Sequence, residues 1–170
     1  MRILHIGDLH FKKKNKYEQS KVIQALLNIL TKEEAIDLIF FSGDLVNNGS
    51  IQSDFKEADD FLFEPLLKSL NVLRDDVFIC AGNHDIDRSV IVNSIITNFS
   101  EKKNVDRKFL ENWYDKQIAD RKASLQSTIN FQTYLGENFK YPENDVLDPL
   151  YSVHKRVLQD KSIGIVTLNT

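Results

Sequence analysis

The sequence is poor in the residues that mark several large classes of protein. It has one cysteine, three prolines and six glycines among 170 residues, which excludes an internal disulfide framework and a collagen-like or low-complexity chain. No apolar run approaches the length of about 18 residues that a membrane helix needs, so we expect no membrane partner. A net charge of −3 gives no global basic field that would draw the chain onto nucleic acid. The single cysteine fits a reducing compartment, and we expect a cytoplasmic protein.

What the sequence does contain is a regular alternation of apolar runs and amphipathic segments. Apolar runs that end at glycine or a polar cluster predict buried strands, and apolar residues at helical spacing predict helices. The predicted order is strand 2–7, helix 18–35, strand 37–41, helix 55–70 and strand 77–81. Pro65 lies inside the second helix, where we expect a kink or a break. The alternation favours an α/β fold with a parallel sheet covered by helices.

The stretch 86–160 does not continue this alternation. Its apolar spacing predicts helices, its part with two prolines and several acids predicts a loop, and a last apolar run predicts a strand. These segments are helices 90–99, 109–121 and 125–135, loop 138–149 and strand 162–168. Because the stretch is too long for a simple crossover, we interpret 86–160 as a mostly helical insertion or cap within a single domain, 1–170.

Three polar clusters follow the three predicted strands of the sheet. They are Asp8-x-His10, Gly43-Asp44 and Gly82-Asn83-His84-Asp85. Asp44 follows Asp8 by 36 residues and Asn83 follows Asp44 by 39 residues, and each interval suits one strand–helix unit. Because ligands bind at the carboxyl ends of parallel strands, we expect the clusters to meet at one edge of the sheet. Carboxylate, imidazole and amide oxygen are ligands for hard or borderline divalent metals.

In this order and spacing, the three clusters resemble the motifs of the calcineurin-like metallophosphoesterases. The resemblance implies the first half of a four-layer α/β sandwich flanked by helices, with a dinuclear manganese, iron or zinc centre. It implies that Asp8 and His10 bind the first ion, that Asp44 bridges the two ions and that Asn83 binds the second. It further implies that His84 is the catalytic residue that contacts the scissile phosphate, with a metal-activated hydroxide as the nucleophile.

Two departures from the family pattern sharpen this expectation. Some branches have an aspartate that pairs with the catalytic histidine at the place where this chain has Asn47. An asparagine cannot stabilise an imidazolium as a carboxylate does, which favours a phosphodiesterase over a Ser/Thr protein phosphatase. The family completes its metal shells with later histidines, but only His154 follows His84. We therefore expect an N-terminal portion of the domain, with weak metal binding, little activity alone and a sheet edge that invites self-association.

Four other polar features outside the proposed ligand set also carry expectations. We expect His5 to be a hydrogen-bonded core histidine close enough to support the site, and His154 to be a solvated histidine on a helix-like stretch. Asp85 either orients His84 or caps the next helix. The lysine-rich segment 12–16 is either a solvated loop or a guide for a polyanion toward the metals.

The same residues leave three functions open. The first is a metal-dependent phosphoesterase, preferably a phosphodiesterase, whose substrate is a phosphoester such as a nucleotide or nucleic acid. The second is a DNA nuclease of the double-strand-break repair type, suggested by the segment 1–10 and the lysines. The third is a binding or sensor domain without turnover, because the metal shells are incomplete.

Overall fold

The computed structural model describes residues 1–33, 35–90, 107–108, 111 and 125–169. Three strands, β1 (Ile3–Ile6), β2 (Leu38–Phe41) and β3 (Val77–Ile79), form a sheet in the order β1-β2-β3. Both pairs are parallel, with Ile3 opposite Leu38 and Ile39 opposite Val77. The predicted parallel sheet is confirmed, and the mixed α/β class is as expected.

The two predicted helices that join these strands are present. A short 3₁₀ helix, η1 (Lys13–Asn15), leads into α1 (Lys16–Leu30), and α2 (Gln52–Leu70) precedes the 3₁₀ helix η2 (Arg74–Asp76). Of the kink or break expected at Pro65, the break is absent because α2 continues through this residue, and the kink stays a prediction. Buried Phe63 and Leu66 hold the helix against the core on either side of the proline. No helix in the described ranges is long and apolar enough to cross a bilayer.

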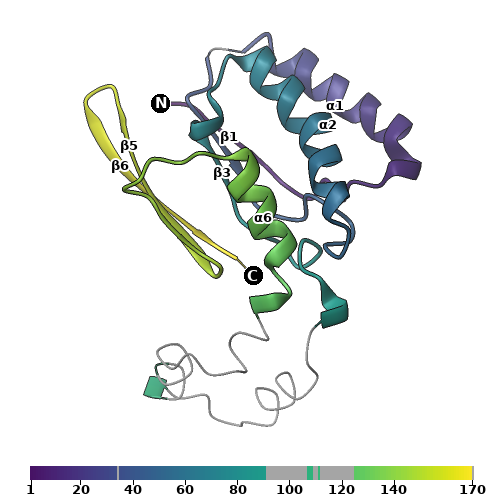
Figure 1. Ribbon diagram of the computed structural model, residues 1–170. Helices are drawn as coiled ribbons and strands as arrows, with labels where there is room; N and C mark the ends of the chain where they lie inside the picture. The colour runs from purple at the N-terminus through teal and green to yellow at the C-terminus, as the bar shows by residue number, and fades with distance from the viewer. Residues whose placement is uncertain (34, 91–106, 109–110, 112–124, 170) are drawn as a thin grey trace.

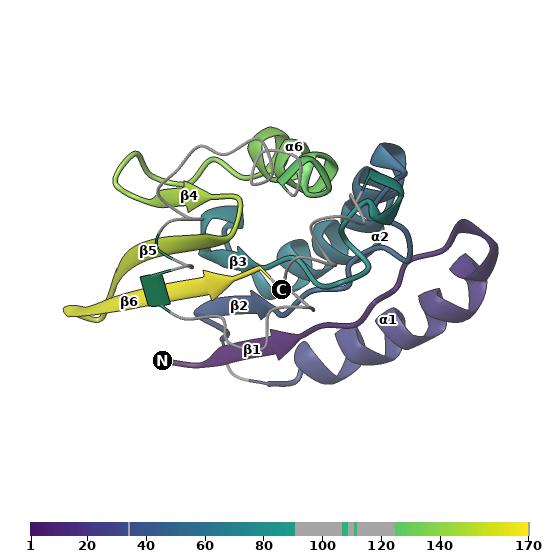
Figure 2. The same cartoon turned by 90° about the horizontal axis from the view of Figure 1, so that it is seen from below.

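Strands β2 and β3 of the first sheet are covered on both faces, whereas the edge strand β1 is exposed on one face. Side chains alternate along β2, so that Ile39 and Phe41 pack with α1 and α2, while Leu38 packs on the opposite face with Phe78 and Ile165. Figures 1 and 2 show α1 and α2 on one side of this sheet and the β5–β6 hairpin on the other. Burial on both faces explains why β2 and β3 are continuous apolar runs in the sequence.

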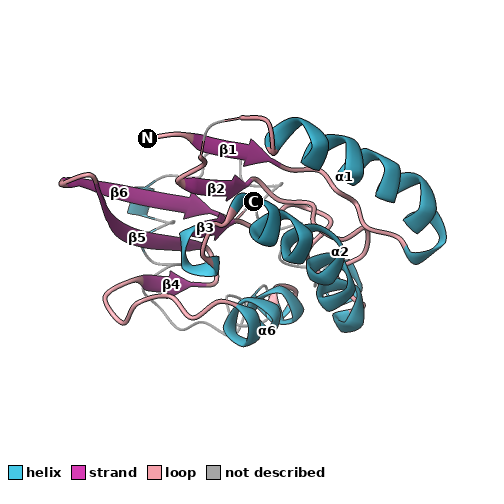
Figure 3. Cartoon of the chain, turned by 90° about the horizontal axis from the view of Figure 1, so that it is seen from above, coloured by secondary structure: helices cyan, strands magenta, loops and turns pink. Residues whose placement is uncertain are grey.

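The second sheet consists of three antiparallel strands beside the first (Figure 3). They are β4 (Val146–Asp148), β5 (Tyr151–Leu158) and β6 (Lys161–Leu168), in the order β4-β5-β6. The helix α6 (Ile129–Asn138) precedes them, and the 3₁₀ helix η3 (Arg88–Val90) follows the third polar cluster. The predicted strand 162–168 is confirmed as β6. The four-layer arrangement of the whole domain stays a prediction.

The expected composition of the segment 86–160 needs two corrections. The part 138–149 is not all loop, because β4 lies within it, and β5 lies within the supposed insertion. A mostly helical character is therefore not confirmed. The predicted helix 90–99, apart from its first residue, and nearly all of the predicted helix 109–121 lie outside the described residues. The segment 125–135 corresponds to the first part of α6 and the turn before it.

The expectation of a solvated, helix-borne His154 is wrong. His154 lies in β5 with its side chain 1% exposed, because strand alternation turns it toward the first sheet with Ser152 and Arg156. Its Nδ1 contacts Asp145 Oδ2 at 2.8 Å and its Nε2 contacts Ser152 Oγ at 2.6 Å. Burial lowers the pKa of His154, and the hydrogen bond to Asp145 opposes this only in part. His154 is thus a neutral, buried hydrogen-bonding residue.

Arg156 fastens the second sheet to the first. Its Nη2 donates to the main-chain oxygen of Asp75 at 2.7 Å, and its Nη1 donates to Asp145 Oδ2 at 3.0 Å. Its guanidinium group lies 5.0 Å from the ring centre of Phe78 in β3. Although burial alone would raise the pKa of Asp145, the hydrogen bonds from His154 and Arg156 lower it. These contacts hold β5 against β3 and the 3₁₀ helix that precedes it.

Candidate metal centre

The loops after β1 and β2 have an unusual backbone at three of the predicted ligand positions. Asp8, His10 and Asp44 have φ values of 57°, 47° and 58°. Left-handed conformations cost of order 1–3 kcal/mol for residues other than glycine and gather at functional sites. The three residues are therefore held by their surroundings in a conformation that points to a function.

Main-chain hydrogen bonds join these two loops. The amide of Asp8 donates to the carbonyl of Gly43 at 3.0 Å, and the amide of His10 donates to the carbonyl of Asp44 at 2.8 Å. Gln19 on α1 holds the first loop from behind, donating from Nε2 to the carbonyl of Leu9 at 2.9 Å. Sequence reasoning missed Gln19, and no motif marks it. These hydrogen bonds within the chain fix the geometry of the loop.

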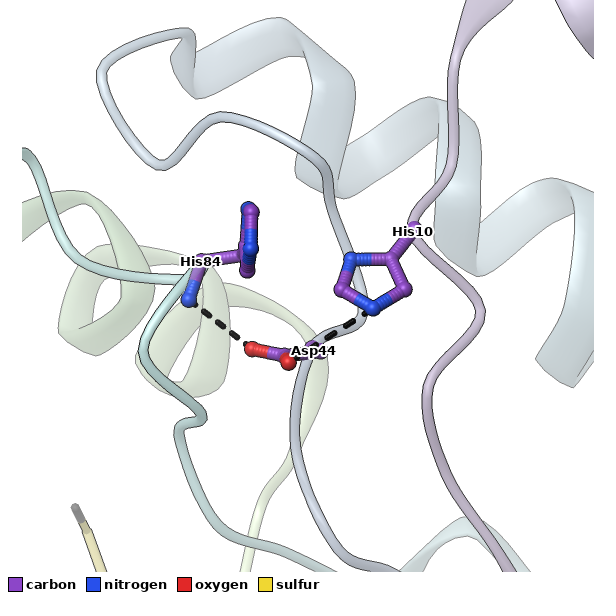
Figure 4. Close-up of side chains that lie close together, drawn as sticks. All are labelled: His10, Asp44 and His84. Carbon is purple, nitrogen blue, oxygen red and sulfur yellow. Dashed lines mark hydrogen bonds and ion pairs between the residues drawn. The ribbon is translucent and has the colours of Figure 1, made fainter.

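His10, Asp44 and His84 converge at the carboxyl edge of the first sheet. Their nearest ligand atoms all lie within 4.8 Å of one another, and Figure 4 shows the two histidines on either side of Asp44. Asp44 Oδ2 lies 3.6 Å from His10 Nε2, while Asp44 Oδ1 accepts a hydrogen bond of 2.8 Å from the main-chain amide of His84. One carboxylate therefore joins the loops after β2 and β3 to the loop after β1.

Asp8 lies at the outer rim of this group. Its Oδ1 is 3.7 Å from His10 Nε2, and its side chain is 81% exposed. His10 Nε2 thus faces Asp8 and Asp44 at distances too long for hydrogen bonds. Asp8 thus faces the imidazole of His10 from one side of the site without belonging to the convergent group of His10, Asp44 and His84, and carboxylate and imidazole are ligand types that suit a divalent cation.

Asn83 faces Asp44 from the loop after β3. With its amide nitrogen toward Asp44, it donates to Oδ2 at 3.2 Å and its amide oxygen accepts from Arg88 Nη2 at 2.6 Å. With the side-chain amide of Asn83 in the opposite orientation, its oxygen would face Asp44 Oδ2. Two oxygen atoms that face each other repel unless a cation lies between them. The side chain can therefore present either a hydrogen-bond donor or a metal-ligating oxygen to Asp44.

A glycine gives Asp44 its close approach to the loop after β3. A Cβ on Gly82 would lie 2.3 Å from Asp44 Oδ1 and 2.5 Å from the Asp44 amide nitrogen. No side chain larger than hydrogen fits there without moving Asp44. The glycine of the Gly82-Asn83-His84 motif thus acts by leaving space for the carboxylate.

The imidazole of His84 is held by the main chain. Its Nδ1 lies 3.0 Å from the carbonyl oxygen of Asn47, and because a carbonyl can only accept, Nδ1 is the protonated nitrogen. The Nε2 atom is left for a substrate or an ion. The sequence drew attention to the side chain of Asn47, but the contact is made by its backbone.

Asp85 takes neither of the two roles expected of it. It is fully buried, and its carboxylate accepts from the amides of Val46 at 3.0 Å and Gly82 at 2.9 Å. Burial raises the pKa of Asp85, and these N–H donors oppose the rise. The residue ties the loop after β2 to the loop after β3, while Asp87 accepts from the amide of Ser89 at the start of η3.

The expectation that His5 is a core residue is wrong. His5 lies in β1 but is exposed, as is its neighbour Ile3 on the same face of the strand. The cause is that β1 is the edge strand of the first sheet, and the packing of the second sheet on Leu38 and Phe78 does not extend to it. His5 is therefore not a core residue, and its role near the site stays a prediction.

Comparisons with known proteins agree with this geometry. The family model of the calcineurin-like phosphoesterases matches residues 1–162, so the chain belongs to that family and the resemblance in its motifs is confirmed. The chain is also similar to an uncharacterized metallophosphoesterase-like protein, YydB, of Bacillus subtilis (strain 168), with 25% identity over 174 residues. That match covers all of this chain and 33% of the relative. No solved structure gives a significant match. The family is one of metal-dependent phosphoester hydrolases.

Proposed function

We propose that the polar clusters of this chain belong to a phosphodiesterase centre that holds two divalent cations, manganese, iron or zinc. The observation that supports the proposal most is the position of Asp44. Its Oδ2 faces His10 from one loop and the amide of Asn83 from another. A carboxylate between two donor sets is suited to be shared by two ions. Asp8 and His10 would hold the first ion and Asn83 the second.

The chemistry then divides between the cations and His84. When bound, two divalent cations would lower the pKa of water and stabilise negative charge that develops on the phosphate. As the imidazolium, with a proton on each ring nitrogen, His84 would give its Nε2 proton to the leaving oxygen, and the neutral ring would keep the Nδ1 proton on the Asn47 carbonyl, which fixes the ring orientation. Because residue 47 is an asparagine and not an aspartate, no carboxylate side chain is available there to pair with His84, which favours a diester over a phosphoprotein as substrate.

The proposal is tested by measuring manganese binding and hydrolysis on the same preparation. We expect the chain to bind manganese weakly and to hydrolyse bis(p-nitrophenyl) phosphate slowly, and faster than p-nitrophenyl phosphate. A chain that binds two ions and hydrolyses neither compound would support a binding or sensor role instead. Hydrolysis of the monoester alone would contradict the preference for diesters.

A further inference from the structure

A groove of about 510 Å³ opens beside the candidate metal centre. Its walls come from the two loops that already supply His10 and Asp44. Lys12, Lys13 and Lys14 line it from the first loop, Asn47 and Asn48 line it from the second, and Asp54 lines it from the first turn of α2. Polar and basic side chains predominate, so the groove does not suit an apolar ligand.

The groove is continuous with the metal centre along both loops. Phe11, next to His10, donates through its amide to the carbonyl of Leu45, next to Asp44, at 3.0 Å. The amide of Asn47 in turn donates to the carbonyl of Phe11 at 3.2 Å. The Asn47 carbonyl is also the acceptor for His84 Nδ1. The groove therefore begins within two or three residues of the metal-facing groups on each loop.

The three lysines differ in their partners. Lys13 Nζ is neutralised by Glu57 at 2.6 Å and lies 3.8 Å from Asp54, so it balances the negative charge of the groove wall. Lys12 and Lys14 form no ion pair within the part of the chain that the structure describes. Their backbone is fixed, since the amide of Lys12 lies 3.4 Å from Gln19 Oε1 and Lys14 belongs to η1. Two positive charges thus remain for a ligand.

We infer that this groove binds a second phosphate group of the substrate, one link away from the phosphate at the metal centre. The inference deepens the proposed function and rests on it. Two unpaired ammonium groups on a preformed loop attract a phosphate by charge and by hydrogen bonds. A substrate with one phosphate would not use them. The second phosphate belongs either to an oligonucleotide strand or to a nucleoside polyphosphate, two sources that share this chemistry.

Binding measurements on the full chain test the inference. The variant Lys12→Gln/Lys14→Gln is compared with the control Lys32→Gln/Lys68→Gln, which loses the same charge. Both control lysines are exposed; Lys32 follows the carboxyl end of α1 and Lys68 lies in the last turn of α2, away from the edge that holds the site. The probes are fluorescein-labelled pentathymidylate, ATP and inorganic phosphate, each with manganese and with a chelator.

We expect the groove variant to bind pentathymidylate, ATP or both on the order of tenfold more weakly, with a salt slope for the oligonucleotide flatter by about 1.4. Binding of inorganic phosphate should change less than twofold, and the control should resemble the unchanged chain. Loss with pentathymidylate alone assigns the groove to a nucleic acid strand, and loss with ATP alone to a nucleotide. Equal losses in the groove variant and the control, or the same loss with inorganic phosphate, would overturn the inference.

The chelator arm separates this inference from the proposed function. If the unchanged chain binds no manganese and hydrolyses no diester, the proposed function fails. Selective loss of pentathymidylate or ATP binding by the groove variant in chelator would still show a phosphate site. Manganese affinity should be equal in all three proteins, and far-ultraviolet circular dichroism should show that they fold alike. Normal metal binding without any effect of the lysines would contradict the inference alone.

Discussion

His84 donates from Nδ1 to the main-chain carbonyl of Asn47 at 3.0 Å. The catalytic candidate is therefore oriented by backbone, and the choice of side chain at position 47 does not remove its partner. This leaves Nε2 as the ring atom for the reaction. The loop after β2 therefore both carries Asp44 and orients the ring of His84 through the Asn47 carbonyl.

The variant His84→Gln tests this role for the ring. We expect hydrolysis of bis(p-nitrophenyl) phosphate to fall by about 10²–10⁴-fold, the usual contribution of a positioned acid or base. Manganese affinity should stay within about threefold of the unchanged chain. The loss of even an outer partner of a metal ligand usually lowers affinity by about 10–100-fold, so a change below threefold shows that the ring does not bind the metal. In the unchanged chain, a ¹⁵N spectrum should show that the neutral ring of His84 is protonated at Nδ1. Loss of metal together with activity would make His84 a ligand and refute this assignment.

Gly82→Ala tests the close approach of Asp44. The added Cβ would meet both the carboxylate and the backbone of Asp44, so we expect the free energy of unfolding to fall by about 1–3 kcal/mol and manganese binding to weaken. Urea unfolding and metal titration measure the two effects. The matched control is Gly136→Ala in α6, where a Cβ would meet nothing within 4 Å. That change should stabilise the chain by about 0.5–1 kcal/mol. A Gly82→Ala chain as stable as the control would show that the space is not needed.

Gln19→Ala tests the support behind the first loop. The change removes the Nε2 donor to the carbonyls of Leu9 and His10. We expect manganese affinity to fall by about tenfold, as is usual when outer partners of metal ligands are lost. Isothermal titration calorimetry measures this effect. Gln24→Ala on the same helix removes only a bond to exposed Asn28 and should leave the affinity unchanged. Equal affinities in both variants would mean that the loop holds its shape without Gln19.

The buried His154 predicts a loss of stability in mild acid. Burial lowers the pKa of His154 in the folded chain, while the unfolded chain takes up a proton near about pH 6.5. Below that pH the unfolded state binds more protons, so the free energy of unfolding should fall between about pH 7.5 and about pH 5.5. His154→Phe should flatten this dependence. The measurement is urea unfolding across that range, and identical slopes for both proteins would contradict the buried, neutral state.

The sequence predicts β2 and β3 of the first sheet well because these strands are apolar on both faces. Ile39 and Phe41 pack on the helices and Leu38 packs on the second sheet, so the whole run is apolar. In β5 the pattern is inverted, with Ser152, His154 and Arg156 buried and Val153 and Val157 exposed. A rule that turns polar residues outward therefore misplaces His154. Its partner Asp145 lies outside the strand and offers no local signal.

The types and spacing of the polar residues predicted which residues form the candidate site, but not the contacts that position them. Asp8, His10, Asp44, Asn83 and His84 all lie at the same edge of the sheet, as the parallel topology requires. The supports are backbone groups and space: the carbonyl that holds His84, and the gap at Gly82. The type of a residue does not show which main-chain groups it contacts, so these two features could not be predicted from the sequence and are visible only in the folded structure.

The central claim is that Asp44 is shared by two metal ions. The most direct measurement is the number of manganese ions bound per chain, determined by calorimetric titration and elemental analysis for the unchanged chain and for Asp44→Ala. Asp60→Ala, an exposed change on α2, is the control. We expect two ions in the unchanged chain and the control, and the loss of both, with affinity lower by more than about 100-fold, in Asp44→Ala. Two ions retained by Asp44→Ala at unchanged affinity would contradict it.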